Sequence, residues 1–315
     1  MPNPTSGDVH VNALLTNISI AYVQAEAAFV SGQVFPVIPV QKQSDYYMSY
    51  DKEDWLRSKA QKRAPGAESA GGGFKIKTDN TYFCDVWAYH QDVDDQTRAN
   101  VDAPLNLDRD ATENVTRQML LAREIDWVST FLVNSVWGSN VTPNPRWDAA
   151  SSYPIADVQT GVDLVESNTG YRPNTLVVTP DVFRVLKSHS TILDRIKYTQ
   201  RGVVTTDLLA SLFEVQKVLV VRAVVDATKE GQLSNPDYLA SNKALLVYAE
   251  PAPGIMKPSG GYTFSWTGLL GGSAGARVKR FRLEQLESDC IEVEAAWDHS
   301  LIATDLGYYF HTPLT

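Results

Sequence analysis

Residue types that catalyse hydrolysis lie together near the end of the chain, where Asp298, His299 and Ser300 are consecutive. A catalytic triad needs a chain of hydrogen bonds through the three side chains. The surrounding residues alternate as in a strand, and adjacent strand residues point to opposite faces, so these three cannot form that chain. We expect a polar strand end and no catalytic residues. The enzyme alternative is an α/β hydrolase-like domain that uses Asp298 and His299.

Metal and phosphate ligands are also sparse. Three aspartates in 92–95 lack the glycine and the terminal glutamate of an EF-hand, so we expect a solvated or salt-bridged acidic turn. Cys84 and His90 have no set of companion ligands with metal-site spacing, and we expect them to be packing residues. The glycines in 71–73 and 271–275 lack the Gly-Lys-Ser/Thr that grips phosphate. We therefore predict no metal and no cofactor.

The composition is that of an ordinary globular protein. The 315 residues include 28 basic and 37 acidic side chains, a net charge of −9, with 43% hydrophobic residues. No apolar run approaches the roughly 18 residues that span a bilayer, and the first basic residue is Lys42, which argues against a signal peptide. The absence of a basic block argues against sequence-specific nucleic-acid binding. Two cysteines suit a reducing compartment.

Residues 41–100 have an unusual composition. Aromatic runs at 46–50 and 82–89 flank a polar middle segment, 51–78, that contains several glycines. This pattern predicts two strands joined by a long loop with too few aliphatic residues for a core of its own. Such a hairpin either is mobile or lies on another chain.

Charge is unevenly distributed along this segment. Residues 42–77 hold eight basic and five acidic side chains (8 − 5 = +3), and residues 78–110 hold two basic and eight acidic ones (2 − 8 = −6). This asymmetry suits contacts between copies of the chain. Trp and Arg are enriched at interface hot spots, whereas a charge run is more often an ordinary solvated surface. We favour intersubunit contact through Lys52, Trp55, Arg57, Lys59, Lys62 and Arg63.

A long helix is expected at 110–137. Asp110 and Glu113 have the spacing of a capping box, and apolar residues then recur at three- and four-residue intervals. At about 1.5 Å per residue the helix would be roughly 40 Å long.

The remainder predicts a mixture of helices and strands. Helices are expected at 18–30, at 154–166 with an end near Gly170, from Pro180, and around 208–213. Strands are expected at 174–178, 217–224, 244–248 and 262–266. Two prolines confine 34–40 to an extended, edge-like path.

The closing segment is strand-like. Residues 291–298 alternate between apolar and acidic or small, and the more basic run 278–286 would pair with them as an antiparallel neighbour, placing Arg and Lys opposite Glu. Residues 301–310 would return alongside this pair.

This order of parts resembles the HK97-fold major capsid proteins of tailed double-stranded DNA bacteriophages. Segments 34–40 (VFPVIPV), 170–180 (GYRPNTLVVTP) and 303–309 (ATDLGYY) are similar to phrases common in such coat proteins. The resemblance implies an α+β HK97-like fold with an N-terminal arm at 1–40 and an extended loop (E-loop) at 41–100. It further implies a peripheral domain at 101–153 and 273–315 with a spine helix at 110–137, and an α/β axial domain at 154–272.

The same resemblance implies a function. Pentamers and hexamers would self-assemble into an icosahedral shell that encloses double-stranded DNA without sequence-specific binding, in a virion assembled in the host cytoplasm. Scaffolding, portal and cement proteins are the partners implied. Some relatives begin with a helical scaffolding segment, but this chain reaches its arm directly after Met1, so we expect a separate scaffolding protein or none. Lys59 and Lys62 could donate to an isopeptide cross-link, but no Asn or Glu partner can be identified. The alternative function is an encapsulin-like compartment shell, which encloses enzymes.

Overall fold

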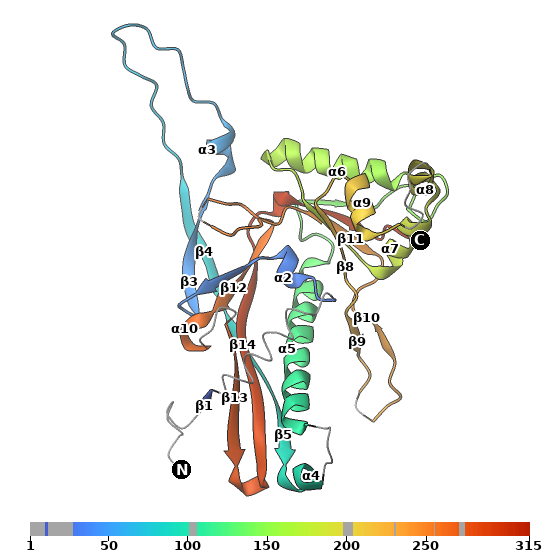
Figure 1. The fold of residues 1–315 in the computed structure, drawn as a ribbon. Coiled ribbons are helices and arrows are strands. Elements are labelled where there is room, and N and C mark those ends of the chain that lie inside the picture. The colour runs from blue at the N-terminus through green and yellow to red at the C-terminus, as the bar shows by residue number, and fades with distance from the viewer. Residues whose placement is uncertain are drawn as a thin grey trace.

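The computed structural model describes residues 10–11, 28–100, 106–197, 204–229, 231–254, 256–270 and 275–315. In Figure 1 a long sheet and a long helix form an elongated body, an α/β unit lies beside its upper end, and a hairpin projects away from both. Among the described residues, no helix is long and apolar enough to cross a membrane. Most of the helix predicted at 18–30 lies outside the described residues.

The long sheet is built around one strand, β14 (Ser288–Leu301). Its neighbours are all antiparallel: β13 (Ala276–Leu283), β5 (Asp85–Asp94) and β12 (Gly261–Trp266). At the edges, β1 (His10–Val11) pairs with β13, and β2 (Val37–Val40) runs parallel to β12. The predicted edge-like path at 34–40 is thus confirmed for β2.

The predicted charge pairing of β13 with β14 is confirmed. Arg277 lies opposite Glu294 and Lys279 lies opposite Glu292. The Arg277 guanidinium is 2.7 Å from the Glu294 carboxylate, and the ammonium of Lys279 contacts both glutamates. These half-buried ion pairs cover one face of the strand pair, while the alternate residues form a core.

That core lies between β14 and the spine helix α5 (Leu107–Phe131). Val115 and Met119 of the helix pack against Ile291 and Val293 of the strand. The predicted capping box was wrong. Asn106 is the N-cap, and its side chain accepts a hydrogen bond from the Arg109 amide at 3.1 Å, a role that spacing alone could not assign.

The helix also ends at Phe131, earlier than the predicted Trp137. The indole of Trp137 folds back and donates to the Phe131 carbonyl at 2.8 Å, which satisfies one of the last carbonyl groups of the helix. Leu132 and Trp137 continue the helical spacing because they pack into a second core with Trp127 and Phe131, although their backbone has left the helix.

The α/β unit contains a five-stranded sheet in the order β6-β15-β11-β7-β8. The core of this unit is made by one large cluster that includes Trp147, Leu176, Leu186 and Leu246. The strands are β6 (Ser139–Val141), β7 (Thr175–Val178), β8 (Lys217–Val220), β11 (Lys243–Val247) and β15 (Gly307–His311), and the helices are α6 (Pro154–Thr169), α7 (Pro180–Ser188), α8 (Ser190–Ile196) and α9 (Thr206–Leu212).

Short elements complete the described chain. They are α2 (Ser31–Val34), α4 (Asp95–Asn100), α10 (Thr267–Leu270), the exposed hairpin of β9 (Val224–Asp226) and β10 (Pro236–Tyr238), and two 3-10 turns, Glu284–Leu286 and Thr304–Leu306.

Two strands belong to a different sheet from the one predicted. The prediction that 301–310 returns beside β14 was wrong, because β15 pairs with β11 and β6 in the α/β unit. Conversely, β12 belongs to the long sheet. Alternating hydrophobicity identifies a strand but not its partner. Gly307, the first residue of β15, lies against Trp137, and a Cβ on Gly307 would be 1.9 Å from the indole ring. The domain limits given above remain a prediction.

The segment that leads into β2 is fastened to the spine helix. The buried Glu124 carboxylate accepts hydrogen bonds from the backbone amides of Val30 at 3.0 Å and Ser31 at 2.9 Å. Phe35 then packs its ring against Trp127 and Phe131. This part of the chain is therefore held rigidly on the body.

Candidate functional site: the projecting hairpin

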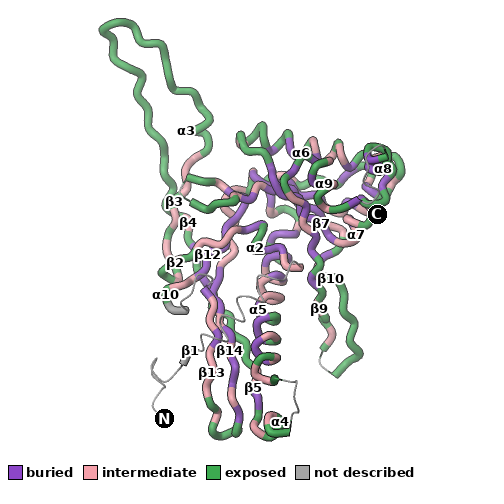
Figure 2. Tube along the Cα trace, viewed as in Figure 1, coloured by how far each residue is buried: buried purple, intermediate pink, exposed green. Residues whose placement is uncertain are grey.

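The hairpin predicted at 41–100 is present over 44–83 and extends into solvent, whereas residues 85–94 form β5 of the long sheet. β3 (Ser44–Tyr50) pairs antiparallel with β4 (Ile76–Phe83), with a bulge between Tyr47 and Ser49. Every residue from 55 to 79 is exposed, and Figure 2 shows the upper hairpin as a continuous exposed segment. The second aromatic run was predicted as one strand, but it is divided between β4 and β5 at the buried Cys84.

The base of the hairpin is anchored on the long sheet. Tyr47 and Tyr82 both pack on Phe264, and the Tyr82 ring stacks on it with centroids 4.6 Å apart. The Asp298 carboxylate accepts from the Phe83 amide at 3.1 Å. An anchored base and an exposed upper part mean that the hairpin has a defined direction, although it lacks a core.

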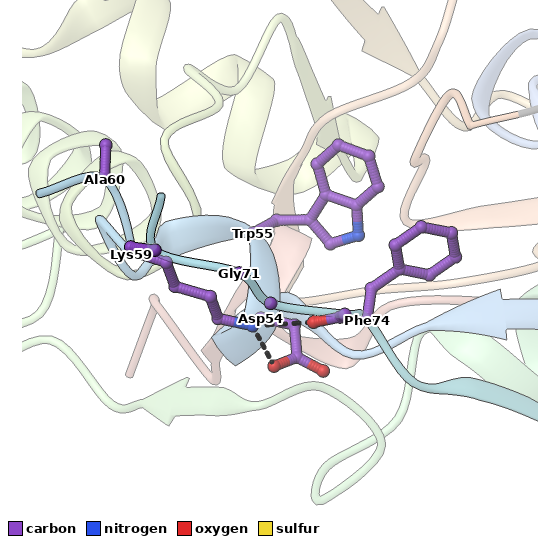
Figure 3. Close-up of a pocket in the computed structure, with 9 residues that line it drawn as sticks. Asp54, Trp55, Lys59, Ala60, Gly71 and Phe74 are labelled. Carbon is purple, nitrogen blue, oxygen red and sulfur yellow. Dashed lines mark hydrogen bonds and ion pairs between the residues drawn. The ribbon is translucent and has the colours of Figure 1, made fainter. Parts of the chain in front are cut away.

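A carboxylate holds the upper hairpin together. The short helix α3 (Lys52–Leu56) carries Asp54, whose side chain accepts from Lys59 at 2.9 Å and from the Lys75 amide at 3.0 Å. Lys59 also donates to the Gly73 carbonyl at 2.8 Å, so hydrogen bonds join the two sides of the loop (Figure 3). The hydrogen bond from Lys59 lowers the pKa of Asp54 below its usual value.

Above these polar contacts lies an unusual aromatic group. The rings of Tyr50, Trp55 and Phe74 have centroids 5.7 to 6.0 Å apart. Trp55 is nevertheless 57% exposed, and Trp55 and Phe74 line an open hollow of about 320 Å³ beside the glycines 71–73 (Figure 3). Three large rings that cover each other only partly form an apolar surface available to a partner.

Of the predicted contact residues, Trp55 and Lys59 line this hollow, and several others are paired within the chain. Lys52 forms an ion pair with Asp305 of the α/β unit, and Arg57 pairs with Glu53 at 3.0 Å. Arg63 donates to the Ala67 carbonyl. Contact of the set with a second copy remains a prediction, and the internal pairs of Lys52, Arg57 and Arg63 also shape the hairpin. The predicted set is Lys52, Trp55, Arg57, Lys59, Lys62 and Arg63.

Sequence reasoning missed the apolar side chains of the hairpin. On β3, Tyr46 and Met48 are 69% and 67% exposed, because this side of the two-stranded ribbon has no cover. Exposure alternates along most of β3, but its sequence SDYYMSY does not alternate between apolar and polar residues, so the sequence carried no sign of which side chains would be exposed. Leu56, Phe74, Ile76 and Phe83 extend the exposed apolar surface.

The acidic segment at 78–110 is partly neutralised inside the chain. Arg98 pairs with Asp108 at 2.9 Å and with Asp289 at 2.8 Å, and Arg282 pairs with Asp95. The expected salt bridge is confirmed for Asp95, but the expected turn was wrong, because Asp92 and Asp94 lie in β5 and Asp95 begins α4. The carboxylates of this segment are therefore less available to a second copy than the sequence suggested.

The residue types of a hydrolase take part in separate contacts. Asp298 accepts from the Phe83 amide and from Ser300 at 3.1 Å, at the hairpin base. On the other face, His299 Nδ1 is 2.9 Å from Thr263 Oγ1, and burial, with Arg123 nearby, lowers the pKa of His299 to about 3. The two side chains serve packing at different places, as the strand geometry predicted.

One of the two packing predictions was wrong. Cys84 is buried, with its thiol 3.6 Å from the Phe264 carbonyl, which agrees with a packing role. His90 is exposed and lies beside Asp92 and Cys290. The companion ligand is two hundred residues away in sequence and is brought close only by strand pairing, so local spacing could not find it.

Sequence comparison gives two relatives that match nearly end to end. The chain is 26% identical over 309 residues to the major capsid protein of Burkholderia phage BcepMu, covering 95% of each chain. It is 24% identical over 310 residues to the major capsid protein of Pseudomonas phage JBD67, covering 94% of each. No family model matches the chain.

Solved structures share the fold. A phage-related protein from Bordetella bronchiseptica superposes with a TM-score of 0.75 at 23% identity, over 97% of this chain and 98% of that one. The mature capsid of bacteriophage PhiM1 gives 0.55 at 12% identity over 99% and 91%. The SrpI encapsulin of Synechococcus elongatus gives 0.54 at 12% identity over 99% and 92%. The chain therefore has the α+β HK97-type capsid fold, and it is a homologue of phage major capsid proteins along nearly its whole length.

Proposed function

We propose that this protein is a major capsid protein whose copies complete one another through the projecting hairpin. The observation that carries the proposal is the contrast between an anchored base and an apolar, coreless upper part. Tyr82 stacks on the body, whereas Trp55 and Met48 are mostly exposed in the single chain. A shell places a neighbour against each hairpin and buries these side chains, which supplies the area that one copy lacks.

The assembly we infer has pentamers and hexamers in an icosahedral shell around double-stranded DNA. The full-length match to phage major capsid proteins supports it. The net charge of −9 and the absence of a basic block suit a protein that does not bind DNA by sequence. Assembly in the host cytoplasm, with scaffolding, portal or cement proteins as partners, belongs to the same proposal.

The test is assembly of the purified chain with and without the hairpin tip. We expect closed particles from the intact chain by electron microscopy. A variant in which residues 57–73 are replaced by a short Gly-Ser turn should keep its folded body, because that stretch contributes nothing to the cores, and should stay unassembled. Closed shells formed by the shortened variant would overturn the proposed role of the hairpin.

The second candidate is an encapsulin-like compartment, favoured by the superposition on the SrpI encapsulin. The two candidates differ in content and not in fold. Particles purified from an expression host carrying the rest of the phage genes should contain DNA if the chain is a phage capsid subunit. Particles that instead contain one enzyme bound by a docking peptide would support the compartment.

A further inference from the structure

Three side chains of metal-ligand type meet at the outer edge of the long sheet. His90 and Asp92 lie on β5, and Cys290 lies on β14. The strand register places Asp92 directly opposite Cys290, with His90 two residues along the same face. A ring nitrogen of His90, a carboxylate oxygen of Asp92 and the Cys290 sulfur all lie within 4.8 Å of one another.

The three groups differ in exposure in a way that suits an ion entering from solvent. Cys290 is 2% exposed, while His90 and Asp92 are exposed. Their face is the one away from α5, because Ile291 and Val293 fill the core on the opposite side of β14. An ion could therefore reach the thiol past two exposed side chains without disturbing the core.

Two carboxylates lie near the thiol, those of Asp92 and Glu292, and Glu292 is itself paired with Lys279 at 3.5 Å. Burial, together with the neighbouring carboxylates of Asp92 and Glu292, raises the pKa of Cys290 to about 12. A divalent cation reverses this balance, because it stabilises the thiolate and the carboxylate together.

We propose that His90, Asp92 and Cys290 form a binding site for a borderline divalent transition metal of the Zn²⁺ type. Nitrogen, oxygen and thiolate sulfur are the ligands that Zn²⁺ takes, at about 2.0–2.3 Å from the ion, which sets ligand atoms about 3.5 Å apart. Rotation of the exposed His90 and Asp92 side chains closes the remaining distance. Ca²⁺ and Mg²⁺ do not fit, because they prefer oxygen ligands. Water fills the fourth position.

The bound ion would clamp an edge strand to the central strand of the body. β5 makes its ladder with β14, and the three ligands bridge these two strands. Binding converts the Cys290 thiol to a thiolate and releases one proton to solvent.

Co²⁺ is the probe, because its thiolate complexes absorb in the near ultraviolet. We expect the metal-free full-length protein to develop a sulfur-to-cobalt charge-transfer band that saturates at one ion per chain and is displaced by Zn²⁺. Cys290→Ser should lose the band. Cys84→Ser is the matched control, since Cys84 is the other buried thiol of the chain and its pKa is also raised to about 12, and it should keep the band.

A second pair of variants avoids the core altogether. His90→Gln and Asp92→Asn change exposed side chains, and each should weaken Co²⁺ binding at least tenfold while circular dichroism stays unchanged. The proposal is overturned if the native protein shows no charge-transfer band, or if Cys290→Ser retains it. It is equally overturned if both exposed variants bind Co²⁺ as tightly as the native chain. Those results would leave the thiol as a simple hydrogen-bond partner of Asp92.

Discussion

Truncation of Trp55 to alanine should separate assembly from folding. The side chain is 57% exposed in the single chain, so less than half of it (100 − 57 = 43%) is covered. Full burial of a large aromatic side chain is worth about 3–5 kcal/mol on truncation to alanine, and the covered share is then worth about 1–2 kcal/mol. This loss falls on the hairpin, which is outside the cores of the body.

Between copies the same change should cost more. A central Trp at an interface contributes about 2–4 kcal/mol on truncation, and 2 kcal/mol corresponds to about a thirtyfold change in an equilibrium constant. We expect the concentration at which shells form, measured by light scattering and sedimentation velocity, to rise at least thirtyfold for Trp55→Ala. The calorimetric Tm of the unassembled chain should move by no more than a few degrees.

Two controls fix the interpretation. Tyr153→Ala removes an aromatic side chain that is 64% exposed at the start of α6, and it should change neither quantity. Trp147→Ala opens the core of the α/β unit, where Trp147 is fully buried, and it should lower Tm strongly. Unchanged assembly by Trp55→Ala, or a fall in its Tm as large as that of Trp147→Ala, would refute the assignment of Trp55 to an interface.

Three further predictions concern the body and the hairpin base. The pKa of His299 is lowered from 6.5 to about 3, so the unfolded chain binds the extra proton and stability is lost as pH falls below 6.5. We expect the free energy of urea unfolding of the unassembled chain to fall between pH 7 and pH 5. This fall should be about 2 kcal/mol larger in the native chain than in His299→Gln. Asp305→Asn breaks the ion pair with Lys52 and should speed proteolysis of the hairpin about twofold to fivefold, and the charge swap Lys52→Asp with Asp305→Lys should restore the native rate. Glu294→Gln leaves Lys279 half-buried with one carboxylate fewer and should cost about 1–2 kcal/mol in urea unfolding, a loss absent from the exposed Glu68→Gln.

Much of the fold could be predicted from local patterns. The helix α6 ends where Gly170 adopts a left-handed conformation with φ 76°, as its glycine suggested. β14 showed its buried face through alternation, and the opposite charges on β13 predicted their pairing correctly. In each case the physical cause lies within a few residues of the element, so the sequence displays it directly.

The misplaced features depend on contacts between distant segments. Trp137 continues the helical spacing but ends the helix through a hydrogen bond to Phe131. β15 has the pattern of any buried strand, and only its pairing with β11, with Gly307 lying against Trp137, places it in the α/β sheet.

The candidate site shows the same division. Composition revealed the coreless hairpin. The ion pairs of Lys52 with Asp305 and of Lys59 with Asp54 could not be predicted in this way, because they depend on where the two carboxylates lie in space. Likewise His90 acquires Cys290 as a neighbour only through the β5 to β14 register.

The central claim is that copies of this chain complete one another through the hairpin, and cryo-electron microscopy of the purified, assembled protein tests it most directly. We predict closed icosahedral shells in which the ring of Trp55 is buried against a neighbouring copy. A shell in which every hairpin tip remains in solvent, or a preparation of monomers with the hairpin folded against its own body, would contradict the claim.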